Sequence, residues 1–200
     1  MTKRLLLILV QTLEVGKTKP HPAHSFGGEQ VYQVFNHFSE QSHINNFPVP
    51  VTKWVCQEEN LAAEDFRFDG SWERQQVPID REVGYRLQFL FAKGLVEGYS
   101  PIIMVGSDCP NLTPELLQEA YQKLETSDVV FGPAKSGGYY LLGLNYLVPE
   151  LFTDIPWGTE QVLCFSLTAA SQLQLKVDLL PELHCLEEET VLHHDPHQLR

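Results

Sequence analysis

Apolar runs that fit buried strands alternate along this chain with segments whose apolar residues recur every three or four positions. The runs end in polar turns and predict strands at residues 5–10, 49–56, 101–105, 128–131, 139–144 and 176–180. The helical spacing predicts helices at residues 29–38, 80–95, 113–124 and 159–173. The third of these helices has the clearest start, because Thr113 suits the N-cap and Pro114 the first helical position.

Strands that alternate with helices predict an α/β fold in which helices cover both faces of a mostly parallel, mixed sheet. We expect one domain with three α/β/α layers over residues 1–200, because no long low-complexity linker divides the chain. Residues 187–200 are charged and rich in histidine, so we expect a loosely packed tail there. The segment 57–78 leaves two interpretations open, a short helix with a loop or an extra hairpin.

The acidic composition narrows the range of partners. Lys and Arg total 14 against 26 Asp and Glu, and the net charge of −12 repels nucleic-acid backbones. It does not exclude a nucleotide bound in a locally positive pocket. The apolar run at residues 5–10 is too short to span a bilayer, so we expect no membrane partner. Four widely spaced cysteines form no Cys-X-X-Cys pair, which favours buried, reduced thiols and a cytoplasmic location.

Asp108 is the most informative polar residue. It lies in the small-residue turn that follows the predicted strand 101–105. We expect this strand and strand 128–131 to end side by side in polar turns, which would form a rim for a charged ligand. A carboxylate in such a turn can hold a divalent metal on a nucleotide diphosphate, or it can cap the turn through its own backbone.

Two lysines follow the first predicted strand. Gly16-Lys17-Thr18 resembles the end of a phosphate-binding P-loop, but Gln11 replaces the required first glycine and two prolines follow. A looser role remains for Lys17 and Lys19, which could contact phosphate groups or could be solvated loop residues.

Two later turns carry further candidates. Ser136, Gly137 and Gly138 permit the backbone to approach a ligand closely, or they simply form a tight turn. In the run Pro156-Trp157-Gly158-Thr159-Glu160, an aromatic ring precedes a predicted helix whose free amides would favour an anion. Trp157 could contact a ligand or belong to the core.

Several motifs, in this order and spacing, resemble a family of bacterial transferases. They are Gly84-Tyr85-Arg86, the run from Gly106 to Leu112, Gly132-Pro133-Ala134, the run from Gly137 to Leu144, and Pro156-Trp157-Gly158-Thr159-Glu160. The family comprises the radical-SAM-associated and arsenosugar-biosynthesis-associated glycosyltransferase-like proteins. They share the GT-A nucleotide-diphospho-sugar transferase fold with molybdenum-cofactor guanylyltransferase and phospholactate guanylyltransferase. The resemblance is strong from Gly84 to Leu167.

The resemblance implies the transfer of a sugar or a nucleotide from a nucleotide-activated small-molecule donor. It assigns Asp108 as the catalytic residue that holds Mg²⁺ or Mn²⁺. It implies substrate-binding roles for a further set of residues, which are Lys17, Lys19, Arg86, Ser136, Gly137, Gly138, Trp157, Thr159 and Glu160.

The chain departs from the family pattern at the implied donor site. Ser136 stands where the family has an aspartate, and a neutral hydroxyl is the weaker ligand for a hard cation. Lys19 stands where the family has an arginine, and a lysine cannot make the bidentate contact with phosphate that an arginine makes. The acidic motif of the family has no clear match in residues 183–192. Two hypotheses follow, a transferase with a weakened metal site, or a catalytically inactive relative that binds a nucleotide or a partner.

Overall fold

The computed structural model describes residues 3–9, 50–58, 72–78, 81–106, 109 and 111–185. Its strands are β1 (Lys3–Leu9), β2 (Thr52–Glu58), β3 (Trp72–Val77), β4 (Tyr99–Gly106), β5 (Val129–Pro133), β6 (Tyr139–Leu144) and β7 (Val177–Leu179). Its α-helices are α2 (Val83–Val96), α3 (Pro114–Lys123) and α4 (Val162–Gln172), and a short 3-10 helix, η4, covers Pro149–Leu151. The predicted loop and helix between residues 12 and 38, and the tail at 187–200, lie outside the described residues.

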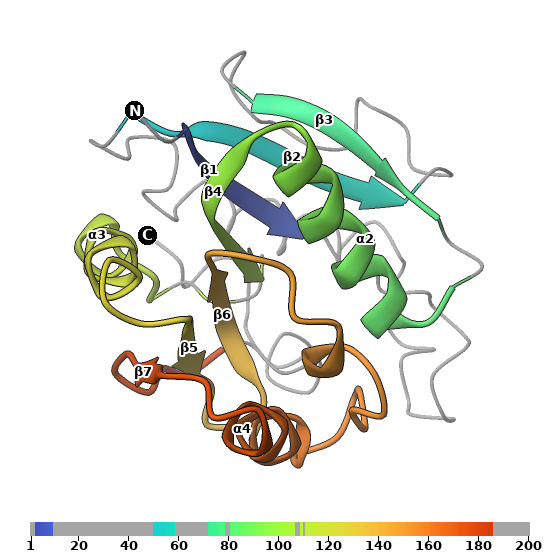
Figure 1. Ribbon diagram of the computed structural model, residues 1–200, viewed down its shortest axis with the longest axis vertical. Coiled ribbons are helices and arrows are strands. Elements are labelled where there is room, and N and C mark those ends of the chain that lie inside the picture. The colour runs from blue at the N-terminus through green and yellow to red at the C-terminus, as the bar shows by residue number, and fades with distance from the viewer. Residues whose placement is uncertain are drawn as a thin grey trace, which may run out of the picture.

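The strands form one mixed sheet in the order β3-β2-β1-β4-β6-β5-β7 (Figure 1). All neighbouring pairs are parallel except those that β6 makes with β4 and with β5. The α/β fold with a mostly parallel, mixed sheet is therefore confirmed. Strand β3 settles part of the undecided segment 57–78, because it pairs in parallel with β2 rather than as the second arm of a hairpin with that strand.

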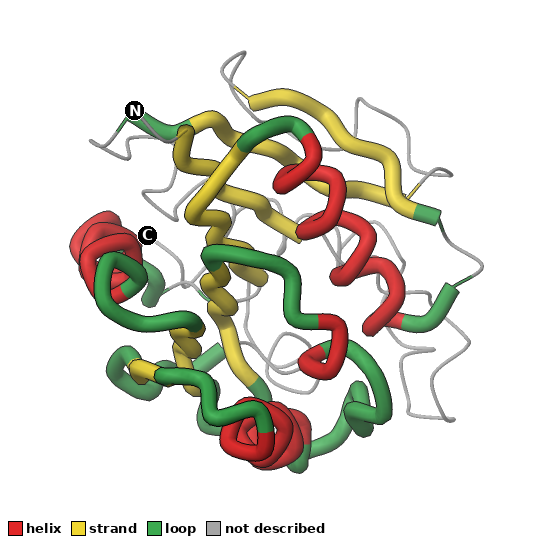
Figure 2. The backbone as a smooth tube through the Cα atoms, in the orientation of Figure 1, coloured by secondary structure: helices red, strands yellow, loops and turns green. Residues whose placement is uncertain are grey.

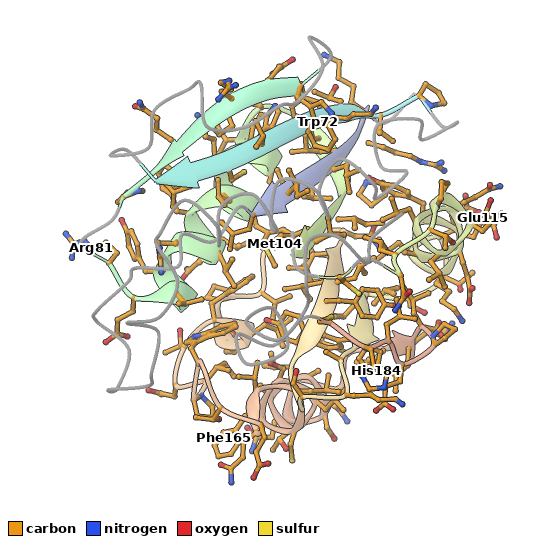
Figure 3. All side chains as sticks on the ribbon, turned by 180° about the vertical axis from the view of Figure 1, so that it is seen from behind. Trp72, Arg81, Met104, Glu115, Phe165 and His184 are labelled. Carbon is orange, nitrogen blue, oxygen red and sulfur yellow. The ribbon has the colours of Figure 1, made fainter. Side chains whose placement is uncertain are left out.

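Alternating residues of the buried strands pack into two apolar cores, one on each face of the sheet. On β1, Leu5 and Leu7 face one core, whereas Leu6 and Ile8 face the other. Helices α2 and α4 with η4 cover the first core, and α3 covers the second. Figure 2 shows α2 lying across the strands on the side toward the viewer. Met104 of β4, which is 6% exposed, lies at the centre of the molecule (Figure 3).

Helix α3 confirms its predicted start and is fixed to the sheet by a buried hydroxyl. The Thr113 side chain accepts a hydrogen bond from the amide of Leu116 at 3.4 Å, and Pro114 is the first helical residue. The hydroxyl of Tyr121 donates to the carbonyl oxygen of Leu5 at 2.8 Å. Burial raises the pKa of Tyr121, so this phenol stays neutral and keeps its proton for the hydrogen bond.

The short strand β7 is held at the sheet edge by polar contacts. The amide of Lys176 donates to a carboxylate oxygen of Asp128 at 2.8 Å. The hydroxyl of Ser127 donates to the carboxylate of Asp178, and the Lys123 ammonium lies 3.6 Å from the same carboxylate. The hydrogen bond from Ser127, followed by the charge of Lys123, lowers the pKa of Asp178.

The cysteines only partly match the expectation of buried thiols. All four are free; Cys56 and Cys109 are buried, Cys185 is half-buried, and Cys164 is exposed on α4. Burial raises the pKa of the Cys56 thiol, which excludes it as a nucleophile at neutral pH.

Candidate functional site

The candidate turns of the sequence analysis lie along one edge of the sheet, the edge that is formed by the ends of β1, β4 and β5. Leu9 pairs with Gly106, so the parallel strands β1 and β4 end at the same level. Leu141 of the antiparallel β6 pairs with both Val105 and Gly132, which brings the end of β5 to this edge as well. The expectation that the strands preceding the two polar turns are direct neighbours is wrong, because β6 lies between β4 and β5. Both strands nevertheless end at the same edge of the sheet.

The turn between β5 and β6 is a tight hairpin whose geometry depends on glycine. The amide of Gly137 donates to the carbonyl of Ala134, and the amide of Ala134 donates to the carbonyl of Gly138, both at 3.0 Å. Gly137 has a φ of 86°, a backbone conformation that residues with a Cβ atom rarely adopt. Ser136 is exposed at the tip, so its hydroxyl is accessible.

Gly137 also brings this hairpin against the run 156–160. A Cβ atom at Gly137 would lie 2.0 Å from the carbonyl oxygen of Glu160, so only glycine permits this backbone contact. The carbonyl of Gly137 accepts a hydrogen bond from the amide of Leu163 at 3.0 Å. Two of the predicted site motifs are therefore joined through their main chains, with the Glu160 side chain exposed beside them.

Trp157 connects the run 156–160 to the start of α2. A Cβ atom at Gly84 would lie 2.6 Å from the indole nitrogen of Trp157 and 2.1 Å from the carbonyl oxygen of Phe152. The indole packs edge-on against the ring of Tyr139, with the ring centroids 6.2 Å apart. Because Trp157 is half-buried and packs against the core under α2, the core interpretation of this residue is the better one. Arg86 lies two residues further along α2 and is partly exposed.

The helix after this run begins later than the sequence predicts. Helix α4 starts at Val162, three residues after the predicted start at Thr159. The Thr159 hydroxyl donates to the carbonyl of Pro156 at 2.8 Å and accepts from the amide of Gln161 at 3.2 Å. The amides of Val162 and Leu163 bond to the carbonyls of Thr159 and Gly137. These three amides already have protein partners, which weakens the expectation that they hold an anion.

The chain returns to this edge after β7, which the sequence did not predict. Leu183 forms a parallel bridge with Ala134, and its amide donates to the carbonyl of Pro133 at 3.0 Å. The thiol of Cys109 lies 3.7 Å from the carbonyl oxygen of His184. The segment 183–185 therefore lies next to both turns. No local pattern could have indicated this, because the contacts join residues far apart in the sequence.

Three predicted site residues, Asp108, Lys17 and Lys19, lie outside the described residues. In the sequence, Asp108 lies between Gly106, the last residue of β4, and the buried Cys109. Among the residues that the structure describes, no group of three or more His, Cys, Asp or Glu side chains could hold a metal ion. None of the described helices is long and apolar enough to cross a membrane.

The strand order and the grouped turns define a protein with the fold of the nucleotide-diphospho-sugar transferases. A candidate nucleotide-diphospho-sugar transferase from Desulfovibrio desulfuricans G20 has this fold, with a TM-score of 0.77 and 25% identity over 93% of this chain and 83% of its own. The chain belongs to the family described as "Uncharacterized protein conserved in bacteria (DUF2064)", whose model matches residues 49–159. No curated protein matches it.

Two more distant structures share the fold alone. The 4-diphosphocytidyl-2C-methyl-D-erythritol synthase of Anaerococcus prevotii DSM 20548 is 11% identical, with a TM-score of 0.58 over 99% of this chain and 97% of its own. Rv0371c of Mycobacterium tuberculosis H37Rv, solved in complex with manganese, is 10% identical, with a TM-score of 0.55 over 93% of this chain and 91% of its own.

Proposed function

We propose that the protein is a transferase that binds a nucleotide-activated small-molecule donor at the edge where β1, β4 and β5 end. The observation that carries the proposal is the joining of three of the sequence motifs at or beside this edge, through Gly84 at the start of α2, Gly137 in the β5–β6 turn and the backbone of Glu160. In open α/β sheets, ligands bind outside the carboxyl ends of the strands. The similar structure from Desulfovibrio desulfuricans is a candidate nucleotide-diphospho-sugar transferase, which supports a nucleotide-activated donor.

We assign the roles in the donor site from sequence position and from the family resemblance. Asp108, directly after β4, would hold Mg²⁺ or Mn²⁺, which offsets the negative charge of the donor phosphates. Lys17 and Lys19, after β1, would contact the phosphates. Manganese in the related fold of Rv0371c supports a divalent cation. The glycines at 137 and 138 would admit the donor or the acceptor, with Thr159 and Glu160 on the acceptor side.

The family resemblance motivates a more specific hypothesis about the group of transferases to which the chain is related. It places the chain with the radical-SAM-associated and arsenosugar-associated glycosyltransferase-like proteins in a bacterial cytoplasm, and relates it to molybdenum-cofactor guanylyltransferase. Transfer of a sugar and transfer of a nucleotide use the same type of donor, and both fit the proposed site.

A thermal-shift screen tests the proposal. The purified protein is heated with UDP-, GDP- and CDP-linked sugars and with the nucleoside triphosphates, each with and without Mn²⁺. A ligand at about one hundred times its dissociation constant stabilises the folded state by about 2.7 kcal/mol. We expect at least one nucleotide to raise the melting temperature only when Mn²⁺ is present. Melting curves that no nucleotide changes would contradict the proposal.

The exposed Ser136 favours a second candidate, a catalytically inactive relative that kept the nucleotide-binding scaffold. Its hydroxyl is neutral, so Asp108 would have no second carboxylate from this turn. The variant Ser136→Asp separates the two candidates. If the variant binds Mn²⁺ more tightly and still shows no turnover, the inactive relative is favoured. Turnover of any sugar nucleotide by the unmodified chain excludes it.

A further inference from the structure

A groove of about 570 Å³ runs along α4 and begins at the joined turns. Its apolar floor is formed by Leu163 and Leu167, one helical turn apart. Its polar side is formed by four side chains, which are Glu160, Thr168, Ser171 and Gln172. The exposed Cys164 is also one of the lining residues. The groove is shallow and open to solvent, because all of its described lining except Gly137 comes from residues 160–172.

The groove is continuous with the site described above. Gly137 and Glu160 line the groove and also form the backbone contact that joins the β5–β6 turn to the run 156–160. The hydrogen bond from the amide of Leu163 to the carbonyl of Gly137 fixes the first turn of α4 at this junction. A molecule in the groove would therefore extend from the helix surface to the edge where we place the donor.

The charge of the lining disfavours anionic ligands. Among the described lining residues, Glu160 is the only charged one, and it is negative. The whole chain has a net charge of −12. An anionic group beside Glu160 would meet repulsion, whereas a hydroxyl group can donate a hydrogen bond to the carboxylate. The leucine floor favours an apolar body over a fully polar molecule.

We infer that this groove binds the acceptor of the proposed transfer, a small molecule with an apolar body and a neutral, hydroxyl-bearing head group. The head group lies at Glu160, next to the donor edge, and the apolar body lies over Leu163 and Leu167. The assignment of the bound molecule as an acceptor rests on the proposed function. The binding preference itself depends only on the groove.

Alkylation of Cys164 reports occupancy of the groove without any enzymatic assay. The protein is treated with iodoacetamide, and the modification of each cysteine is followed by peptide mass spectrometry. The probes are n-octyl β-D-glucoside, below its micelle concentration, and octanoate. At about ten times its dissociation constant, the glucoside is expected to slow alkylation of Cys164 about tenfold. Cys185, which is half-buried and is not among the residues that line the groove, should keep its rate.

Matched variants assign the protection to the groove. Thr168→Trp fills the groove with an indole from an exposed position and should abolish protection by the glucoside. Phe165→Trp adds a similar ring on α4 at a residue that is 46% exposed and points away from the molecule (Figure 3), and it should leave protection intact. Octanoate should protect the unmodified chain more weakly than the glucoside does, and Glu160→Gln, which removes the repulsion, should strengthen protection of Cys164 by octanoate by up to about threefold.

Three results would overturn the inference. They are equal protection by octanoate and the glucoside in the unmodified chain, protection that Thr168→Trp leaves unchanged, and a change of oligomeric state in Thr168→Trp on light scattering, which would assign the groove to a second copy of the chain. None of these results affects the binding of a nucleotide with Mn²⁺. The inference and the proposed donor site can therefore fail separately.

Discussion

At the scale of single residues, two glycines set how closely the turns of the site approach one another. Gly84 leaves room for the indole of Trp157, and Gly137 leaves room for the carbonyl of Glu160. Gly138, directly beside Gly137, has no atom within 4 Å of the place where a Cβ atom would lie, and its φ is outside the left-handed region. The adjacent glycines therefore have different roles, and only the first is required by the packing.

This difference predicts opposite outcomes for two neighbouring substitutions. Gly137→Ala should lower the free energy of unfolding by about 2 kcal/mol or more, because it adds left-handed backbone strain and a clash with main-chain atoms. Gly138→Ala should change it by less than about 1 kcal/mol in either direction. Urea unfolding followed by tryptophan fluorescence measures both. Equal losses in the two variants would show that the contact with Glu160 is not rigid.

At the scale of elements, helix α3 illustrates how a local signal fixes a boundary. Thr113 and Pro114 determine its start without help from the rest of the chain. Thr113→Ala should cost about 1 kcal/mol of unfolding free energy, because the amide of Leu116 loses its side-chain partner. Thr126→Ala, at an exposed position just after the same helix, serves as the control and should cost less than about 0.5 kcal/mol. A larger loss for the control would contradict this account of the cap.

The contacts that hold β7 predict a dependence of stability on acid pH. The pKa of Asp178 is lowered in the folded state from its usual value of 3.8. The ionised carboxylate therefore stabilises the fold above pH 3.8, and this contribution is lost as the pH falls through the lowered pKa. Asp178→Asn should be less stable than the unmodified chain at pH 7, and this gap in unfolding free energy should narrow at a pH below 3.8. Urea titrations at both values measure the gap; a gap that stays constant would exclude ionisation of Asp178 as its cause.

The same contrast between local and distant contacts explains what the sequence could predict. Strand β6 and helix α3 follow from residues that are neighbours in the chain, so both were predicted closely. The antiparallel pairing of β6 with β4 and the return of Leu183 beside Ala134 join residues far apart in the sequence and leave no local pattern. Trp157 remained ambiguous because an aromatic residue beside a turn suits both a core and a ligand. Contacts with Gly84 and Tyr139 favour packing of the half-buried ring against the core, and a ligand contact of Trp157 stays a prediction.

At the scale of the whole molecule, the sheet brings motifs from distant parts of the chain to one edge. The ends of β1, β4 and β5, the start of β6 and the segment after β7 all meet there. The chain as a whole is strongly acidic, so binding of a phosphate-bearing donor requires a local source of positive charge. The proposed donor site would supply this charge with a divalent cation on Asp108 and with two lysines after β1. The cation is therefore its central requirement.

Calorimetric titration of UDP- and GDP-linked sugars, in the presence of Mn²⁺, tests this requirement most directly. The titration compares the unmodified chain with Asp108→Asn and with the control Glu97→Gln, which removes a charge just before the start of β4, at the opposite end of that strand. We predict binding by the unmodified chain and the control, and an affinity at least about tenfold lower for Asp108→Asn, a loss of about 1.4 kcal/mol. Equal affinity in all three proteins, or Mn²⁺-independent binding by the unmodified chain, would contradict the account.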